Sequence, residues 1–228
     1  MAAKYDKKGN YAGYNKNNKE RAMLDYYSTP VEEVTNILER LGIDFSYSTI
    51  LEPSCGGGHM VKGIEDYLAQ NPSCANDVNI IATDVAKREG KYFKDSFLVG
   101  EEYDFLPDTY PIKDGIDWII MNPPYATIEY FTIKSLELAK KGVILLARLQ
   151  FLESQSRYEH IFKEVQPTDV YIYVDRISCK KNGNEEIKEN SVQCYAWILF
   201  DKQNPKPCEL HWITSKNYKN WINKKNML

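Results

Sequence analysis

Apolar and polar positions along the chain follow two different periods. Short, nearly continuous apolar runs predict buried β-strands, and longer stretches with apolar residues three or four positions apart predict helices that bury one face. The predicted strands are residues 49–51, 78–83, 97–99, 117–121, 142–147, 170–174 and 193–200. The predicted helices cover residues 30–41, 59–69, 128–140 and 155–165, and a further helix is expected to begin near Val85.

This order of elements predicts the fold class. Strands and helices alternate up to residue 174, which is typical of an α/β protein with a doubly wound, mostly parallel seven-stranded sheet and helices on both faces. The last two strands form a hairpin around a polar loop, so the final strand is expected to be antiparallel. Ligands of such sheets bind at the carboxyl ends of the strands.

Composition narrows the class of protein. The 228 residues suffice for one domain with a full core, which we place at residues 25–200. No run has the length of a transmembrane helix and no apolar segment stands near the amino terminus, so we expect a cytoplasmic protein without membrane contact. Five cysteines without a Cys-x-x-Cys pair and three scattered histidines predict reduced thiols and no metal site.

The net charge of -3 is unevenly distributed. Residues 1–24 are polar and Lys-rich and are predicted to form a flexible basic arm, and residues 201–228, with six lysines and two acidic residues, a basic tail. Lys180 and Lys181 form a third basic piece in the loop before the last strand. Such pieces can grip a polyanion locally, although solvation explains each of them as well.

A glycine-rich turn, Glu-Pro-Ser-Cys-Gly-Gly-Gly at residues 52–58, follows the first predicted strand and precedes a helix. A strand, glycine turn and helix open a nucleotide-binding unit, in which glycine lets the backbone approach a ligand closely. Val61 replaces the third glycine of a dinucleotide fingerprint, and no Gly-Lys-Ser/Thr follows, so a ligand without a pyrophosphate fits better. Asp84 ends the second strand, where an acid can accept both ribose hydroxyls or cap the helix behind it.

The apolar strand at residues 117–121 ends at Asn122, Pro123, Pro124 and Tyr125. The side-chain oxygen of Asn122 and the carbonyl of Pro123 can accept the two protons of a planar amino group, and Tyr125 offers a ring for stacking. Taken alone, the same residues also suit a strand that ends in a proline turn.

Five motifs in order resemble the S-adenosylmethionine-dependent N6-adenine DNA methyltransferases of the gamma motif order. They are Ser-Thr-Pro at 28–30, the turn at 52–58, Asp84, Asp-Phe-Leu at 104–106 and Asn-Pro-Pro-Tyr at 122–125. The resemblance implies that Asn122, Pro123, Pro124 and Tyr125 are catalytic and that S-adenosyl-L-methionine is the cofactor. It implies cofactor contacts by Thr29, Glu52, Ser54, Cys55, Gly56, Gly58, Asp84, Val85, Asp104 and Phe105.

Within these contacts, the resemblance assigns Thr29 and Glu52 to the methionine moiety. It assigns Asp84 to the ribose, and Asp104 and Phe105 to the adenine of the cofactor. The expected activity is methyl transfer to the N6 amine of adenine in DNA, with the target base flipped out of the duplex.

Other functions stay open. The same tetrapeptide suits methyl transfer to an exocyclic amine of RNA or to a protein glutamine amide, and a chain of this fold can also be a catalytically silent binding subunit. Only residues 201–228 remain beyond the last predicted strand, too few for a target-recognition domain. We therefore expect a partner protein to supply specificity, or selectivity to be low.

Overall fold

The computed structural model describes residues 26–88, 90–181, 183 and 193–218. Within them lies an eight-stranded sheet, whose neighbours are parallel except that β9 is antiparallel to both β6 and β7. In spatial order the strands are β10 (Glu209–Ile213), β7 (Asp169–Tyr173), β9 (Tyr195–Asp201), β6 (Gly142–Arg148), β5 (Trp118–Met121), β2 (Thr49–Glu52), β3 (Asn79–Asp84) and β4 (Leu98–Val99). The predicted α/β class, the mostly parallel sheet and the hairpin of β7 with β9 are confirmed.

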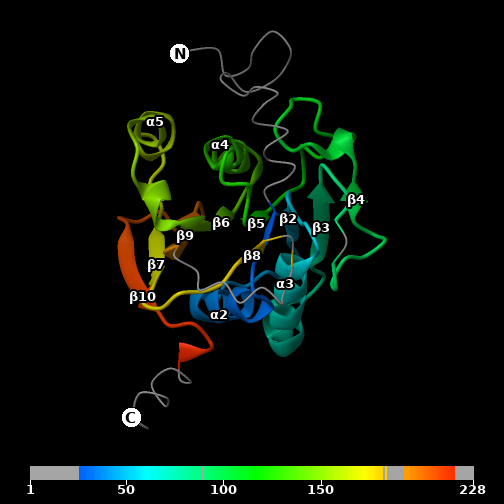
Figure 1. The fold of residues 1–228 in the computed structure, drawn as a ribbon, viewed down its shortest axis with the longest axis horizontal. Helices are drawn as coiled ribbons and strands as arrows, with labels where there is room; N and C mark the ends of the chain where they lie inside the picture. The colour runs from blue at the N-terminus through cyan, green and yellow to red at the C-terminus, as the bar shows by residue number, and fades with distance from the viewer. Residues whose placement is uncertain (1–25, 89, 182, 184–192, 219–228) are drawn as a thin grey trace.

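Helices cover both faces of the sheet, with α2 (Val31–Leu41) and α3 (His59–Gln70) on one side and α4 (Ile128–Leu138) and α5 (Gln155–Arg157) on the other (Figure 1). Single-turn helices are η1 (Pro72–Cys74), η2 (Glu101–Tyr103), η3 (Leu149–Leu152) and η4 (Tyr158–Phe162). None of these helices has the length and apolar character needed to cross a membrane.

The central strand β5 shows why its sequence is apolar throughout. Ile119 and Met121 belong to the core cluster that also contains Phe131 of α4, whereas Trp118 and Ile120 belong to the cluster beneath α2 and α3. All four residues of β5 are buried. An inner parallel strand must be apolar on both sides because helices cover both faces.

Strand order places a topological switch at β2 and β5. From β2 the chain passes through α3 to β3 and then β4, moving toward one edge, and afterwards returns to β5 on the other side of β2. The loops after β2 and β5 therefore lead to opposite faces, and ligands of such sheets bind at the carboxyl ends of the strands at this switch point.

A second, two-stranded sheet joins two distant segments of the chain. It pairs β1 (Tyr27–Ser28) with β8 (Lys180–Lys181) in antiparallel register. The side chain of Asn122, directly after β5, donates to the carbonyl of Tyr27. This small sheet is thereby attached to the carboxyl end of the main sheet.

The structure differs from the sequence predictions in three local features. The eighth strand, β10, falls within residues 201–228, which were predicted to be a tail. It is an edge strand with one neighbour, β7, so most of its side chains are exposed and its sequence shows no apolar run. The helix expected near Val85 is wrong: in the described residues between β3 and β4 the chain forms a loop. Helix α2 begins after Pro30, and neither Ser28 nor Thr29 caps it by a side-chain hydrogen bond.

Candidate active site at the ends of β2 and β5

Asn122 is held in one orientation by the segment that contains β1. Its Nδ2 donates to the carbonyl of Tyr27 and to Oγ1 of Thr29, each at 3.1 Å. A backbone carbonyl can only accept, so the nitrogen of the amide must face Tyr27. The other atom, Oδ1, is buried and has no hydrogen-bond partner among the described residues. Asn122 thus presents one acceptor at the carboxyl end of β5.

Glu52 stands in the same situation at the end of the neighbouring strand β2. Its Oε1 accepts from the backbone N–H and the hydroxyl of Ser54, both at 3.0 Å. Its Oε2 is buried and, within the described part of the chain, has no partner. Burial raises the pKa of Glu52 to about 8. Glu52 and Asn122 line one small cavity, together with Thr29 and Cys55.

The glycine turn between β2 and α3 has no room for side chains at two positions. Gly56 and Gly58 have φ angles of +52° and +84°. A Cβ on Gly56 would lie 2.2 Å from the ring of Tyr26, and one on Gly58 would lie 2.3 Å from the carbonyl oxygen of Tyr92. Burial raises the pKa of the Cys55 thiol in the same turn. The turn therefore offers backbone groups rather than a reactive thiolate.

Asp84, at the end of β3, is built into this turn. Its Oδ2 accepts from the N–H of Gly56 at 2.9 Å, its Oδ1 accepts from the N–H of Ala86 at 3.0 Å, and Nε of Arg88 lies 4.0 Å from Oδ1. Burial raises the pKa of Asp84. Each oxygen retains a lone pair for a further donor, so the predicted ribose contact of Asp84 stays a prediction, as does the predicted cofactor contact of Val85.

Tyr26 covers the turn, and sequence reasoning missed it. Its hydroxyl accepts from the N–H of Gly57 at 2.9 Å and is 3.2 Å from Nδ1 of His59. The guanidinium carbon of Arg88 lies 5.8 Å from the centre of its ring. Burial raises the pKa of Tyr26 to about 12, so the hydroxyl is protonated at neutral pH. With this ring in place, the cavity beside Glu52 has only about 10 Å³.

Asp104 and Phe105 do not line that cavity. Asp104 is buried and accepts from the N–H of Leu106 at 3.3 Å. The ring of Phe105 is 1% exposed and packs on Tyr110 and Phe131 with ring centres 5.1 and 5.0 Å away. This ring belongs to the core, so the predicted contact with the cofactor's adenine would require it to leave that packing.

Tyr125 is surrounded by three residues that the sequence analysis did not select. The guanidinium carbon of Arg148 lies 3.9 Å from the centre of its ring, and the ring of Tyr27 lies at 5.4 Å with a 33° tilt. Its hydroxyl is hydrogen-bonded to that of Tyr195 at 2.7 Å. Arg148 ends β6 and Tyr195 begins the antiparallel β9, so strand direction could have placed both at this edge.

The two prolines have different surroundings. Pro123 is buried, whereas Pro124 is partly exposed. The carbonyl of Pro124 accepts from the N–H of Thr127 at 3.0 Å and so belongs to the turn that leads into α4. The acceptor role of the Pro123 carbonyl stays a prediction.

No family model and no curated protein matches this sequence. Among solved structures, a modification subunit of a presumed type I restriction enzyme from Vibrio vulnificus YJ016 is 12% identical with a TM-score of 0.57, over 89% of this chain and 53% of that one. A presumed class I S-adenosylmethionine-dependent methyltransferase from Listeria monocytogenes is 11% identical with a TM-score of 0.56, over 94% and 72%. The chain has the Rossmann-like fold of S-adenosylmethionine-dependent methyltransferases.

A third similar structure is the type I restriction-modification system methyltransferase subunit from Streptococcus thermophilus. It is 12% identical with a TM-score of 0.54, over 82% of this chain and 47% of that one. The present chain spans about half the length of this structure and of the one from Vibrio vulnificus. These likenesses establish the fold and leave the reaction to be inferred from the site.

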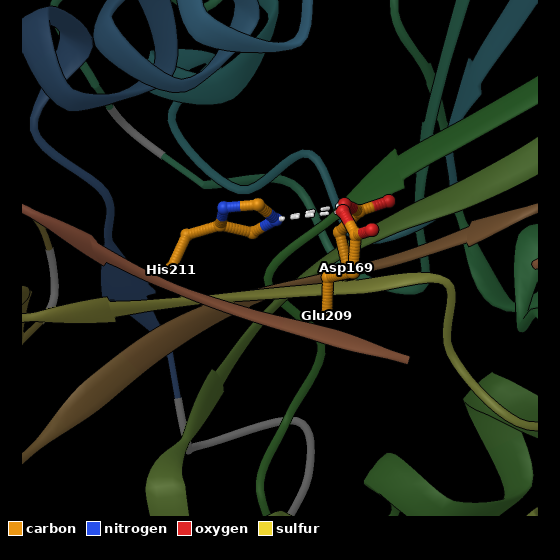
Figure 2. A group of neighbouring side chains, drawn as sticks. All are labelled: Asp169, Glu209 and His211. Carbon is orange, nitrogen blue, oxygen red and sulfur yellow. Dashed lines mark hydrogen bonds and ion pairs between the residues drawn. The ribbon is translucent and has the colours of Figure 1, made fainter. Parts of the chain in front are cut away.

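Three residues of the kinds that bind metal ions cluster away from the carboxyl ends of β2 and β5. Asp169 of β7 meets Glu209 and His211 of β10, with ligand atoms within 4.8 Å of one another (Figure 2). Nζ of Lys206 already lies 2.9 Å from Asp169 and 2.8 Å from Glu209. Burial acts to raise the pKa of Asp169, but hydrogen bonds from Lys206 and His211 outweigh it and lower this pKa. The ammonium group of Lys206 bridges the two carboxylates, so the cluster is a salt-bridge network.

The basic pieces proposed to contact DNA are only partly described. Lys180 and Lys181 form β8 and pair with Ser28 and Tyr27 of β1, which places them one strand away from the residue that orients Asn122. The predicted arm at 1–24 and residues 219–228 of the predicted tail lie outside the described residues. Contact of these pieces with DNA stays a prediction.

Proposed function

We propose that this chain transfers a methyl group from S-adenosyl-L-methionine to the N6 exocyclic amine of adenine in DNA. The observation that carries the proposal is the orientation of Asn122. Its Nδ2 is tied to Tyr27 and Thr29, and its Oδ1 is buried without a partner among the described residues. A buried acceptor of this kind costs free energy unless a ligand donates to it.

The chemistry of an amino group explains why such an acceptor is useful. The lone pair of an adenine amino nitrogen is delocalised into the ring, which makes the nitrogen a poor nucleophile. If Oδ1 of Asn122 and the carbonyl of Pro123 accept its two protons, the nitrogen becomes more pyramidal and its lone pair is freed for attack. Tyr125 would stack on the flipped base and hold it at the correct distance.

The residues at the end of β2 suit the proposed cofactor. S-adenosyl-L-methionine, when bound, supplies a methyl group on a positively charged sulfur and also carries an ammonium group. The unpartnered Oε2 of Glu52 is a buried anion-forming atom that such a cation would satisfy. Gly56 and Gly58 keep the adjacent backbone free of side chains. Glu52 would hold the methionine moiety, and Asp84 would accept from the ribose hydroxyls.

DNA is the proposed substrate, and a second protein the proposed source of sequence specificity. Two of the similar structures are described as subunits of type I restriction enzymes or restriction-modification systems, and this chain covers only about half of each. Lys180 and Lys181, paired with β1, supply nearby positive charge for phosphate contacts. Methyl transfer to RNA or to a glutamine amide and a silent binding role are the alternatives.

A transfer assay tests the proposal. The protein is incubated with isotope-labelled S-adenosyl-L-methionine and, separately, with unmethylated genomic DNA, total RNA and a protein extract, and the products are analysed for N6-methyladenine. We expect label in DNA only. Label in RNA or protein would show that the substrate is not DNA. Cofactor binding without any transfer would favour the silent binding subunit.

The variant Asn122→Ala tests the role of the oriented amide. We expect the rate of transfer to fall on the order of a hundredfold or more, as for removal of a preorganised group at a reacting centre, while cofactor affinity is kept. Asn204→Ala, on an exposed turn after β9, is the control and should keep the wild-type rate. A rate for Asn122→Ala within about threefold of wild type would contradict the role assigned to the amide.

A further inference from the structure

The ring of Tyr125 has a cation on one face. The guanidinium carbon of Arg148 lies 3.9 Å from the ring centre, which is contact distance for a cation–π interaction. Nε of Arg148 is buried and, among the described residues, has no hydrogen-bond partner. No carboxylate is paired with Arg148 in the described part of the chain. The guanidinium is therefore placed for the ring of Tyr125 and, through a side-chain hydrogen bond, for Tyr195, rather than for a salt bridge.

A second contact fixes the edge of the same ring. The hydroxyls of Tyr125 and Tyr195 are hydrogen-bonded at 2.7 Å. Burial raises the pKa of both tyrosines, so both hydroxyls are protonated at neutral pH and one can donate to the other. Tyr195 begins β9, in the centre of the sheet, and is itself 3% exposed. The edge of the Tyr125 ring is thus tied to a rigid element.

A third side chain, that of Tyr27, also lies beside the ring of Tyr125. The ring of Tyr27 lies 5.4 Å away with a tilt of 33°, which is not close parallel stacking. Only the backbone of Tyr27 is needed to orient Asn122, because its carbonyl accepts from Nδ2. The ring can therefore rotate away without disturbing Asn122. A planar ligand that displaces the Tyr27 ring would then contact the Tyr125 ring on that side.

We propose that Arg148 is a positioning residue for Tyr125, which holds the ring so that its face toward Tyr27 receives the target base. This inference rests on the proposed function, because it assumes that the planar ligand is an adenine. Arg148 touches neither the base nor the cofactor; it acts through Tyr125. The Tyr27 ring occupies the place of the base in the substrate-free protein and leaves it when the base enters.

Kinetics of Arg148 variants test the positioning role. For Arg148→Gln we expect kcat/KM for DNA to fall roughly two- to thirtyfold, the range of a cation–π contact, with unchanged cofactor affinity. Arg148→Lys keeps the cation and should restore part of the loss. Arg40→Gln, exposed at the end of α2, is the matched control for loss of a positive charge. A full loss in Arg148→Lys equal to that in Arg148→Gln would overturn the cation–π argument.

A double-mutant cycle separates action through Tyr125 from general damage. In a Tyr125→Ala background, Arg148→Gln should have no further effect on kcat/KM, because the ring that it holds is gone. Effects that multiply would overturn the proposal, since independent or merely structural losses are additive in free energy.

A third measurement needs no reaction. Nuclear magnetic resonance of isotope-labelled tyrosine rings, assigned with Tyr125→Phe, reports how well ordered the Tyr125 ring is. We expect an ordered ring in the wild type and in Arg40→Gln, and a more mobile one in Arg148→Gln. An equally ordered ring in Arg148→Gln would refute the positioning role, whereas absence of methyl transfer by the wild type would refute the proposed function alone.

Discussion

The ends of β2 and β5 differ from the end of β3 in how their polar side chains are used. Glu52 and Asn122 each have one polar atom bound within the protein and one buried oxygen without a partner among the described residues. At the end of β3, both oxygens of Asp84 accept backbone N–H groups from the chain itself. The first pair has an oxygen free for a ligand, whereas Asp84 holds the turn and would bind a ribose in addition to that structural task.

This difference separates two kinds of functional residue. A buried oxygen without a hydrogen-bond partner lowers the stability of the free protein, and a ligand that donates to it removes this penalty. Removing such an oxygen by mutation should therefore affect binding or rate more than folding. A carboxylate that holds a turn together contributes to stability, so its loss should affect the fold and the site together. The three predictions below test the two sides of this comparison.

The largest effect is expected for the pH dependence of cofactor affinity. Glu52 must be ionised to pair with a cationic ligand, and its pKa of about 8 in the free protein means that it is mostly neutral at lower pH. Each pH unit below that value should therefore cost about tenfold in affinity, or on the order of a hundredfold from pH 8 to pH 6. Isothermal titration calorimetry with S-adenosyl-L-methionine at several pH values measures this directly.

Glu52→Gln is the matched variant for that experiment. It keeps the size of the side chain and an oxygen for Ser54 but cannot ionise, so its affinity should be low and nearly independent of pH. Wild-type affinity that stays flat between pH 6 and pH 8 would show that the Glu52 carboxylate is not the partner of the cation.

A smaller effect, on stability, is expected for Asp84. Asp84→Ala leaves the buried N–H of Gly56 and the partly buried N–H of Ala86 without their acceptor and should lower the free energy of unfolding by about 1–3 kcal/mol. Asp84→Asn keeps one side-chain oxygen and should lose less. Urea denaturation of the two variants and the wild type provides the comparison. Equal stability of all three would place Asp84 with Glu52 and Asn122, as a residue available to a ligand.

Much of the fold could be predicted from the sequence because it depends on apolar periodicity. The strands at 117–121 and 142–147 are apolar on both faces, and their apolar runs predicted them as buried strands. The strand β10 was missed because an edge position imposes no such pattern: Trp212 is 66% exposed. Apolar periodicity predicts strands whose side chains are buried. It does not predict a strand that is held mainly by backbone hydrogen bonds.

Site residues that belong to a short sequence motif could be predicted, whereas residues that distant segments bring to the site were missed. Asn122 and Glu52 stand in recognisable motifs at strand ends. Tyr26 and Arg148 reach the site only because β1 is fastened to β5 through Asn122, and because β6 ends at the same edge as β5. Strand direction could have placed Arg148, but the contact of Tyr26 with the glycine turn depends on tertiary geometry that no local pattern signals.

The smallest effect tests whether Tyr26 closes the glycine turn after β2 in the free protein. The hydroxyl of Tyr26 accepts from the N–H of Gly57, and the cavity that remains beside Glu52 is far too small for a cofactor. If the ring must move before the cofactor binds, Tyr26→Phe removes a hydrogen bond worth about 1 kcal/mol from the closed state. Cofactor affinity should then rise about fivefold in calorimetry.

Tyr47→Phe, which alters an exposed hydroxyl, should leave the cofactor affinity unchanged. Lower affinity in Tyr26→Phe would mean that the hydroxyl itself binds the cofactor. Unchanged affinity would mean that the ring stays in place and that the cofactor approaches the glycine turn from another side. A rise in affinity is the only result that fits a ring standing in the path of the ligand, because only then does weakening the closed state favour the bound one.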